Sequence, residues 1–137
     1  MTAAEQLVRS LLGLEGHAKA DPFDQSRRAA HIHPDVEFSL FGPTGTKELG
    51  VGRDSYFAFV SGCDAALADR SDEILDIVAI DEECVFVRAS AYRKSAATGA
   101  ELRYQWATLM RVEDGLVTYV TDMLDRDAQQ FWGRVAP

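Results

Sequence analysis

An acidic residue in an otherwise apolar strand is the side chain of this sequence best suited to chemistry. Asp122 lies between Val120 and Leu124 in the run 116–124, where alternate residues share one face of a strand. A carboxylate on a buried face loses hydration, which raises its pKa toward the range useful for proton transfer at neutral pH. The pattern therefore predicts general acid and base chemistry at Asp122. The alternative is that Asp122 lies at a solvated rim or pairs with an arginine.

The run 102–112 predicts the strand that pairs with the one carrying Asp122. One of its faces is mostly apolar and consists of Leu102, Tyr104, Trp106, Thr108, Met110 and Val112. We expect a three-residue loop, Glu113 to Gly115, which would place Trp106 opposite Asp122. A two-residue turn would instead place Ala107 there and move the carboxylate to the polar side.

The strand predicted for residues 84–93 supplies possible partners for Asp122. One of its faces carries Arg88, Ser90 and Tyr92. If Arg88 points inward, Asp122 is its obvious partner, because an unpaired buried charge is very costly.

Tyrosines would complete this site. We expect Arg88 and the phenol of Tyr56 or Tyr92 to orient or polarise a substrate oxygen. We expect the substrate to contact a further set of residues: Trp106, Phe38, Phe57, Leu124, Ser90 and His33. The aromatic members of this set would otherwise be ordinary core residues.

The histidines and cysteines do not predict a metal site. His31 and His33 have a spacing that could bind one metal on a strand, but they lie at the end of a predicted helix, and His17 is the only other imidazole. Cys63 and Cys84 are too few and too far apart for a zinc knuckle or a disulfide framework, so we expect reduced thiols. We therefore expect no metal and no cofactor.

The composition narrows the range of partners. The 22 acidic and 14 basic residues give a formal charge of −8, which repels nucleic acid and anionic lipid. No segment has the pattern of a signal peptide or a membrane span. We expect one soluble, cytoplasmic domain spanning residues 1–137.

The order of elements predicts an α+β fold. The expected elements are a helix over 3–20, a short helix over 24–31, a strand at 36–40, a helix capped by Asp54, strands at 74–80, 84–93, 102–112 and 116–124, and a last helical turn over 127–135. The short connections between the last four strands favour an antiparallel meander. Such a sheet can wrap around one long helix and leave a cavity at its mouth.

Three motifs in this order resemble a known superfamily. They are Ile32-His-Pro-Asp-Val-Glu-Phe38, Gly52-Arg-Asp54 before an aromatic helix, and Tyr119-Val-Thr-Asp-Met-Leu-Asp125. Together they resemble the nuclear transport factor 2-like superfamily, and most of all its SnoaL-like and ketosteroid isomerase-like branch. The resemblance implies a cone-shaped α+β barrel with an apolar pocket. It also implies a homodimer through the outer face of the sheet.

The same resemblance argues against two of the reactions that some members catalyse. Epoxide hydrolases of this fold use an Arg-x-Asp, a tyrosine and an asparagine, whereas the matching residues here are Arg88-Ala-Ser90, Phe38 and Leu40. The strand 36–41 also lacks the aspartate that serves as the base in the ketosteroid isomerases. What remains implied is a SnoaL-like arrangement, in which an aspartate acts on an aldol-type or enolisation step.

Two hypotheses about function stay open at this point. The first is a cofactor-independent lyase or isomerase, of the cyclase, isomerase or dehydratase type, in which Asp122 transfers a proton on a small apolar carbonyl compound. The second is a non-catalytic ligand-binding module or dimer whose pocket is closed by Trp132 and by the aromatic helix that Asp54 caps. Dimerisation is expected in both cases, because one helix layer would not cover the mixed sheet face formed by Arg103, Gln105, Leu109 and Tyr119.

Overall fold

The computed structural model describes residues 1–13, 19–25 and 28–135. The elements follow in the order α1 (Ala3–Leu11), β1 (Lys19–Ala20), β2 (Ile32–Gly42), β3 (Gly45–Val51), α2 (Arg53–Ala65), β4 (Leu67–Ala79), β5 (Cys84–Ser95), β6 (Glu101–Glu113), β7 (Leu116–Leu124) and α3 (Arg126–Val135).

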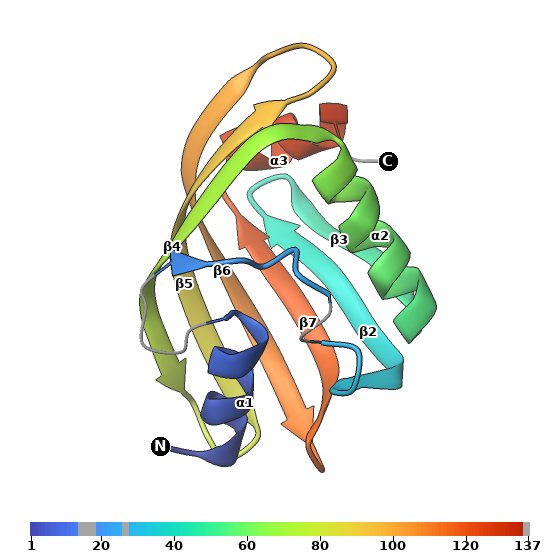
Figure 1. Ribbon diagram of the computed structural model, residues 1–137, viewed down its shortest axis with the longest axis vertical. Helices are drawn as coiled ribbons and strands as arrows, with labels where there is room; N and C mark the ends of the chain where they lie inside the picture. Colours follow the sequence, from blue (N-terminus) through green and yellow to red (C-terminus); the bar gives the residue numbers. More distant parts are fainter. Residues whose placement is uncertain (14–18, 26–27, 136–137) are drawn as a thin grey trace.

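The strands form one curved sheet in the order β1-β4-β5-β6-β7-β2-β3. Neighbouring strands are antiparallel except β2 and β7, which run parallel. Figure 1 shows α2 beside β2 and β3 across the open side of the sheet, α1 over the lower part of β4 to β6, and α3 near the upper end. The predicted α+β fold, a curved sheet wrapped around a helix, is confirmed.

The inner face of the sheet forms the core. In β5 the residues Val85, Val87, Ala89 and Ala91 are buried, and in β6 the buried residues alternate from Tyr104 to Val112. Helix α1 closes one end of this core with Ala4, Val8 and Leu11. The alternation in the sequence therefore identified the buried face of β6 correctly, because one side of that strand faces the core.

Several predicted element boundaries were wrong. Helix α1 ends at Leu11, and residues 14–18 of the longer predicted helix lie outside the described residues. Residues 28–30 form turns rather than the end of a second helix, and residues 26–27 lie outside the described part. The expected loop after residue 42 is mostly strand β3, whose residues are exposed or half-buried. A strand with no buried face shows no alternation of apolar residues, which is why the sequence did not predict it.

The turn between β6 and β7 also differs from the prediction. Glu113 pairs with Leu116, so the connection is the two-residue turn Asp114-Gly115. Both residues have positive φ, 52° and 75°, as a type I′ turn requires. The predicted three-residue loop was wrong.

A β-bulge then changes the register again. The pairing shifts by one residue between Arg111 and Val112, so that Thr108 lies opposite Asp122 and Trp106 lies opposite Leu124. Without the bulge the two-residue turn would have placed Asp122 opposite Ala107, on the outer side. The predicted partner Trp106 was therefore wrong by two positions, while the predicted face of Asp122 is correct.

A buried ion pair joins β4 to β5 on the inner side of the sheet. Arg93 donates two hydrogen bonds to the carboxylate of Asp72, at 2.8 and 3.0 Å, and the two residues are only 2% and 3% exposed. The indole Nε1 of Trp106 donates to the same carboxylate at 2.7 Å. Three strands, β4, β5 and β6, thus meet at one carboxylate.

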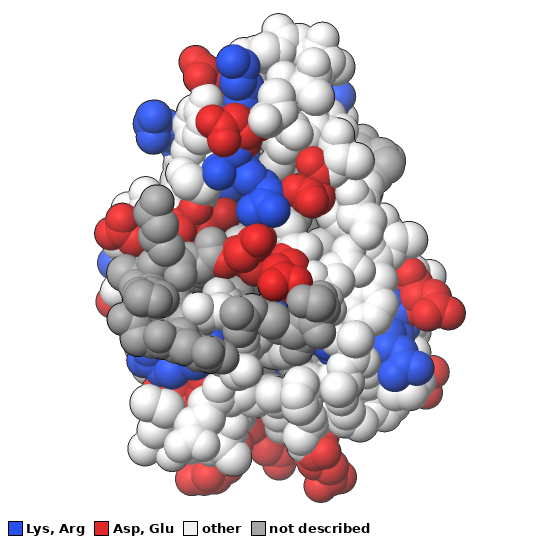
Figure 2. Space-filling model, viewed as in Figure 1, with Lys and Arg blue, Asp and Glu red and all other residues white. Residues whose placement is uncertain are grey.

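The surface carries both signs of charge. In Figure 2 the basic and acidic side chains are interspersed, and the described part of this face has no continuous basic patch. No helix in the described ranges is long and apolar enough to cross a bilayer.

We predict that Asp72→Asn lowers the free energy of unfolding by about 3–5 kcal/mol, because it leaves the buried charge of Arg93 without its counterion. The matched control is Asp76→Asn, which removes an ion pair to Arg88 whose side chains are 41% and 46% exposed. That loss should cost less than about 1 kcal/mol. Urea denaturation of the three proteins measures both effects, and similar midpoints for the two variants would contradict the prediction.

Candidate functional site

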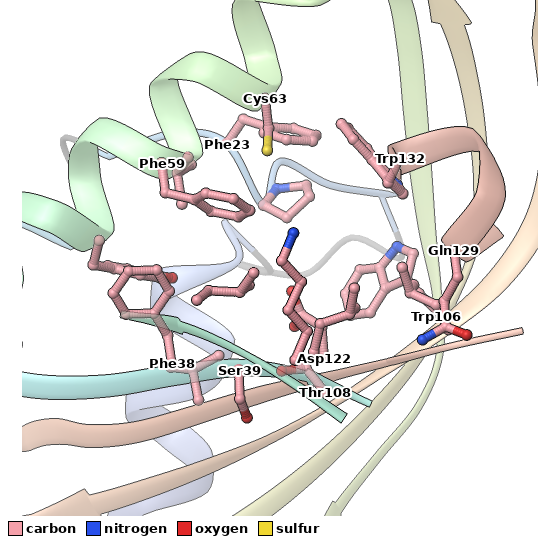
Figure 3. A pocket seen from close by; sticks show the side chains of 18 of the residues that line it. Phe23, Phe38, Ser39, Phe59, Cys63, Trp106, Thr108, Asp122, Gln129 and Trp132 are labelled. Atoms are coloured by element: carbon pink, nitrogen blue, oxygen red, sulfur yellow. The ribbon is translucent and has the colours of Figure 1, made fainter. Parts of the chain in front are cut away.

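A cavity of about 490 Å³ opens between the inner face of the sheet and the helices α2 and α3. Its walls are mainly apolar and include Phe38, Leu49, Phe59, Trp106, Met110 and Val120. Figure 3 shows Phe38, Phe59, Trp106 and Trp132 arranged around the same space, with Asp122 near its floor. The volume and lining are those of a small-molecule site.

Asp122 lies in the middle of the cavity floor. It pairs with Leu40 of β2 on one side and with Thr108 of β6 on the other, and all three side chains line the cavity. The residue is half-buried, and its accessible part belongs to the cavity wall. The sheet therefore holds this carboxyl group against the interior space.

Burial raises the pKa of Asp122 above its ordinary value. The Thr108 hydroxyl and the positive charges of Arg28 and Arg93 act in the opposite direction without cancelling the loss of hydration. A carboxyl group with a raised pKa is a stronger base when ionised and keeps its proton to a higher pH. Both properties suit proton transfer near neutral pH.

A second polar group in the cavity is the pair Arg28 and Tyr56. The Nη1 of Arg28 donates to the phenol oxygen of Tyr56 at 2.5 Å, and both residues are buried and line the cavity. Burial raises the pKa of Tyr56, and the charge of Arg28 offsets this only in part. The phenol is therefore protonated at neutral pH, and its O–H can donate while its oxygen accepts from Arg28.

The segment around Arg28 is anchored to α2. The side-chain amide of Gln25 donates to the carbonyl of Phe57 at 3.0 Å and to the hydroxyl of Ser61 at 2.6 Å. The backbone N–H of Arg28 donates to the carbonyl of Gln25 at 3.0 Å. Gln25 thus holds Arg28 on the same wall as Tyr56.

The upper wall contains polar groups that are already engaged. Trp132 of α3 donates its indole N–H to the phenol oxygen of Tyr104 at 3.0 Å.

Burial, together with the charge of Asp122, raises the pKa of Cys63 to about 12. The thiol of Cys63 is consequently protonated and unsuited to act as a nucleophile.

Five of the predicted site residues lie together around the cavity: Asp122, Tyr56, Trp106, Phe38 and Leu124. Phe57 instead packs against Tyr56, with ring centroids 5.9 Å apart, and is not among the residues that line the cavity. The aspartate and one phenol of the predicted site are thus in the same cavity.

Three predicted residues on β5 lie on the outer face of the sheet. Arg88 pairs with Asp76 at 2.7 Å, Tyr92 hydrogen-bonds to Glu101, and Ser90 is exposed. The small apolar residues of β5 occupy the inner side, so the alternate residues must point outward. The placement of Arg88 beside Asp122 was therefore wrong, and neither Arg88, Ser90 nor Tyr92 reaches the cavity.

His33 also lies away from the cavity. Its Nδ1 accepts a hydrogen bond from the backbone N–H of Asp35 at 2.9 Å. His33 and His31 line a separate groove, together with Asp114 and Gly115 of the turn between β6 and β7. In the part of the chain that the structure describes, no three His, Cys, Asp or Glu side chains form a group that could hold a metal ion.

Sequence reasoning missed three polar residues of the cavity. Arg93 continues the inward series of Val87, Ala89 and Ala91, so strand parity alone could have placed it inside. Thr108 was assigned to the buried face, but not as the residue opposite Asp122. Arg28 had no signal in the sequence, because its position depends on the anchoring of Gln25 to α2.

Asp122 should make the stability of the protein depend on pH. Its pKa is raised in the folded state, so between about pH 4 and that raised value the folded protein holds a proton that the unfolded chain has released. The contribution of Asp122 to the free energy of unfolding should therefore fall as the pH rises across this window. Asp122→Asn removes this contribution, so the variant should gain stability relative to the wild type with rising pH. Urea denaturation over a pH series tests this, and a constant difference would contradict it.

Comparison with known proteins agrees with this geometry. The family model described as SnoaL-like domain matches residues 19–120. A nuclear transport factor 2-like protein of unknown function from Burkholderia pseudomallei has a similar structure, with a TM-score of 0.72, 18% identity and coverage of 100% of both chains. A putative SnoaL-like polyketide cyclase from Jannaschia has a TM-score of 0.71 at 15% identity and covers 100% of this chain and 97% of its own.

A putative ketosteroid isomerase from Kribbella flavida is similar over 88% of this chain and 76% of its own, with a TM-score of 0.65 and 21% identity. At such identities the likeness shows a common fold. No curated protein matches the sequence significantly. The structural neighbours show that the chain has the nuclear transport factor 2-like fold, and the family match shows that it belongs to the SnoaL-like domain family.

Proposed function

We propose that this protein is a cofactor-independent acid and base catalyst of the cyclase, isomerase or dehydratase type, acting on a small apolar carbonyl compound. The observation that carries the proposal is the position of Asp122. It is a desolvated carboxyl group on the floor of an apolar cavity that also contains the Arg28–Tyr56 pair.

The cavity supplies the groups that enolisation needs. Ionised Asp122 would take a proton from the carbon next to the carbonyl group, and the electron pair of that C–H bond would move to the carbonyl oxygen. Tyr56 and Arg28 would stabilise the resulting enolate by donating hydrogen bonds to that oxygen. Return of the proton to another carbon completes an isomerisation. In a cyclisation the enolate carbon would instead attack a second carbonyl group, and the alkoxide formed there would take the proton back from Asp122.

The apolar lining strengthens these interactions. Charges interact more strongly where water is excluded, so the developing negative charge on the substrate oxygen gains more from Arg28 than it would at the surface. Polyketides and ketosteroids, named for two of the structural neighbours, are carbonyl compounds with large apolar surfaces. This supports the same class of substrate here.

We predict that Asp122→Asn lowers catalysis at least about a hundredfold, because the amide cannot accept the proton. The measurement is protein-dependent exchange of hydrogen for deuterium at the carbon next to the carbonyl, followed by NMR in D₂O. The probes are apolar ketones and 1,3-dicarbonyl compounds. Asp76→Asn makes the same chemical change on the outer face of the sheet and should leave the rate unchanged.

Two outcomes decide between the hypotheses. Exchange that survives in a folded Asp122→Asn protein removes the proposed role of Asp122. A wild-type protein that binds these probes but catalyses no exchange supports the non-catalytic binding module instead.

We further propose that the protein forms a homodimer through the outer face of its sheet. Val78, Phe86 and Leu109 lie side by side on neighbouring strands of that face, and we name them the outer apolar row. Val78 is exposed, and Phe86 and Leu109 are half-buried. An apolar row in the middle of a sheet face would be covered by a second copy of the same face.

We predict that Leu109→Asp raises the dimer dissociation constant more than about tenfold, because it places a charge in the outer apolar row. Ser55→Asp on the exposed side of α2 adds the same charge elsewhere and should leave association unchanged. Sedimentation velocity at micromolar concentrations measures both variants. A monomeric wild-type protein would refute the dimer.

A further inference from the structure

The charge of the cavity differs in sign from that of the whole chain. The chain has a formal charge of −8, yet the charged residues that line the cavity in the described part are Arg28, Lys47, Arg93 and Asp122. Asp72 lies behind the wall and neutralises Arg93 through two hydrogen bonds. The remaining balance is two cations, Arg28 and Lys47, against the single carboxyl group of Asp122.

The two cations differ in position. Lys47 lies on the exposed strand β3, opposite Leu40, which separates it from Asp122 by one strand. It therefore reaches the cavity from the edge of the sheet. Arg28 is 3% exposed and belongs to the inner wall.

The guanidinium group of Arg28 has an unused donor. Its Nη1 donates to Tyr56, but its buried Nε has no hydrogen-bond partner in the described structure. A buried N–H without an acceptor is unfavourable, and more so when the group carries a charge. The described partner, a phenol, is neutral at neutral pH and does not balance that charge.

We propose that the cavity binds compounds with an anionic oxygen on an apolar body, and that this oxygen accepts hydrogen bonds from the guanidinium group of Arg28 and from the Tyr56 hydroxyl. A carboxylate or a stabilised enolate has the required chemistry. The inference rests on the proposed function, because it names the substrate class of the same site. The apolar body would contact the aromatic side of the cavity, where Phe38, Phe59 and Trp106 lie (Figure 3).

An anion suits this position better than a neutral oxygen. Hydrogen bonds from an arginine to an anionic oxygen are stronger than those to a neutral one, and the anion also compensates a buried positive charge. Lys47 at the edge would attract an anion toward the cavity, whereas the rest of this acidic chain would repel it.

The test compares ligands that differ only in charge. Isothermal titration calorimetry would measure binding of 2-naphthoate and 4-phenylbutanoate, each against its primary amide, with 2-naphthol as the neutral hydroxyl compound. The wild-type protein should bind each carboxylate at least tenfold more tightly than its amide. Equal affinity for acid and amide, or no binding of either carboxylate at millimolar concentration, would overturn the inference.

Variants then assign the preference to Arg28. Arg28→Met keeps the length and apolar stem of the side chain but should reduce the preference for the carboxylate to less than threefold. Arg28→Lys keeps the charge but not the planar guanidinium group, and it should show a smaller preference than the wild type. Arg88→Met removes an arginine from the outer face and should leave the preference intact. If Arg28→Met does not fold, the wild-type comparison and Arg28→Lys decide the question.

This experiment is independent of catalysis. Binding of 2-naphthoate needs no proton transfer, so Asp122→Asn should retain the preference for the carboxylate even though it slows exchange. Loss of exchange without loss of the preference supports both proposals. If the protein catalyses exchange but shows no preference for the carboxylate, only the proposal of an anionic ligand is overturned.

Discussion

The pairing of β6 with β7 determines where the candidate catalytic group lies. Strand residues alternate between two faces, so a shift of one residue would move Asp122 from the cavity to the outer side. With the Asp114-Gly115 turn alone, Asp122 would point to the outer face. The bulge beside Arg111 shifts the pairing by one residue and turns Asp122 toward the cavity. The bulge is therefore part of the site, although it lies toward the opposite end of the strands from Trp106 and Leu124.

Once Asp122 faces inward, its environment follows from the neighbouring strands and the Gln25 segment. Leu40 and Thr108 flank it, the apolar walls reduce its hydration, and Arg28 lines the same cavity. An acid with a raised pKa and a buried cation can share this space because their charges attract across a medium that screens poorly. The pair of Asp72 and Arg93 has a different role. The two charges neutralise each other within the sheet, although Arg93 Nε has no hydrogen-bond partner in the described structure.

The parts of this fold that follow from local pattern were predictable. The alternation in β5 and β6 comes from one buried face and predicted the sheet. In β7 the position of Asp122 between Val120 and Leu124 predicted that it faces inward. Strand β3 has no buried face and left no pattern. Parity predicted the face of Asp122 correctly although the register was two positions off, because a shift by two residues keeps the face. Arg88 was misplaced because both faces of β5 contain apolar residues, and only the structure shows that the smaller ones are inside.

The position of Arg28 could not have been predicted in this way. It depends on hydrogen bonds between Gln25 and residues of α2 that lie 32 and 36 positions later in the chain. Such contacts leave no periodic trace in the sequence. A cavity residue outside the regular elements, such as Arg28, is thus harder to predict than Asp122, which lies on a patterned strand.

The parallel pairing of β2 with β7 has a consequence for the order of folding. These strands meet through contacts such as the 2.8 Å hydrogen bond between Ser39 and Thr121, which are 82 positions apart. Contacts between such distant residues form late, because a long loop must close first. During synthesis, β2 leaves the ribosome long before its partner exists, so the floor around Asp122 can form only after almost the whole chain has been made. The edge of β2 that pairs with β7, including Phe38, must therefore stay unpaired until the hairpin of β6 and β7 has been synthesised. The cavity can close only when the chain is nearly complete.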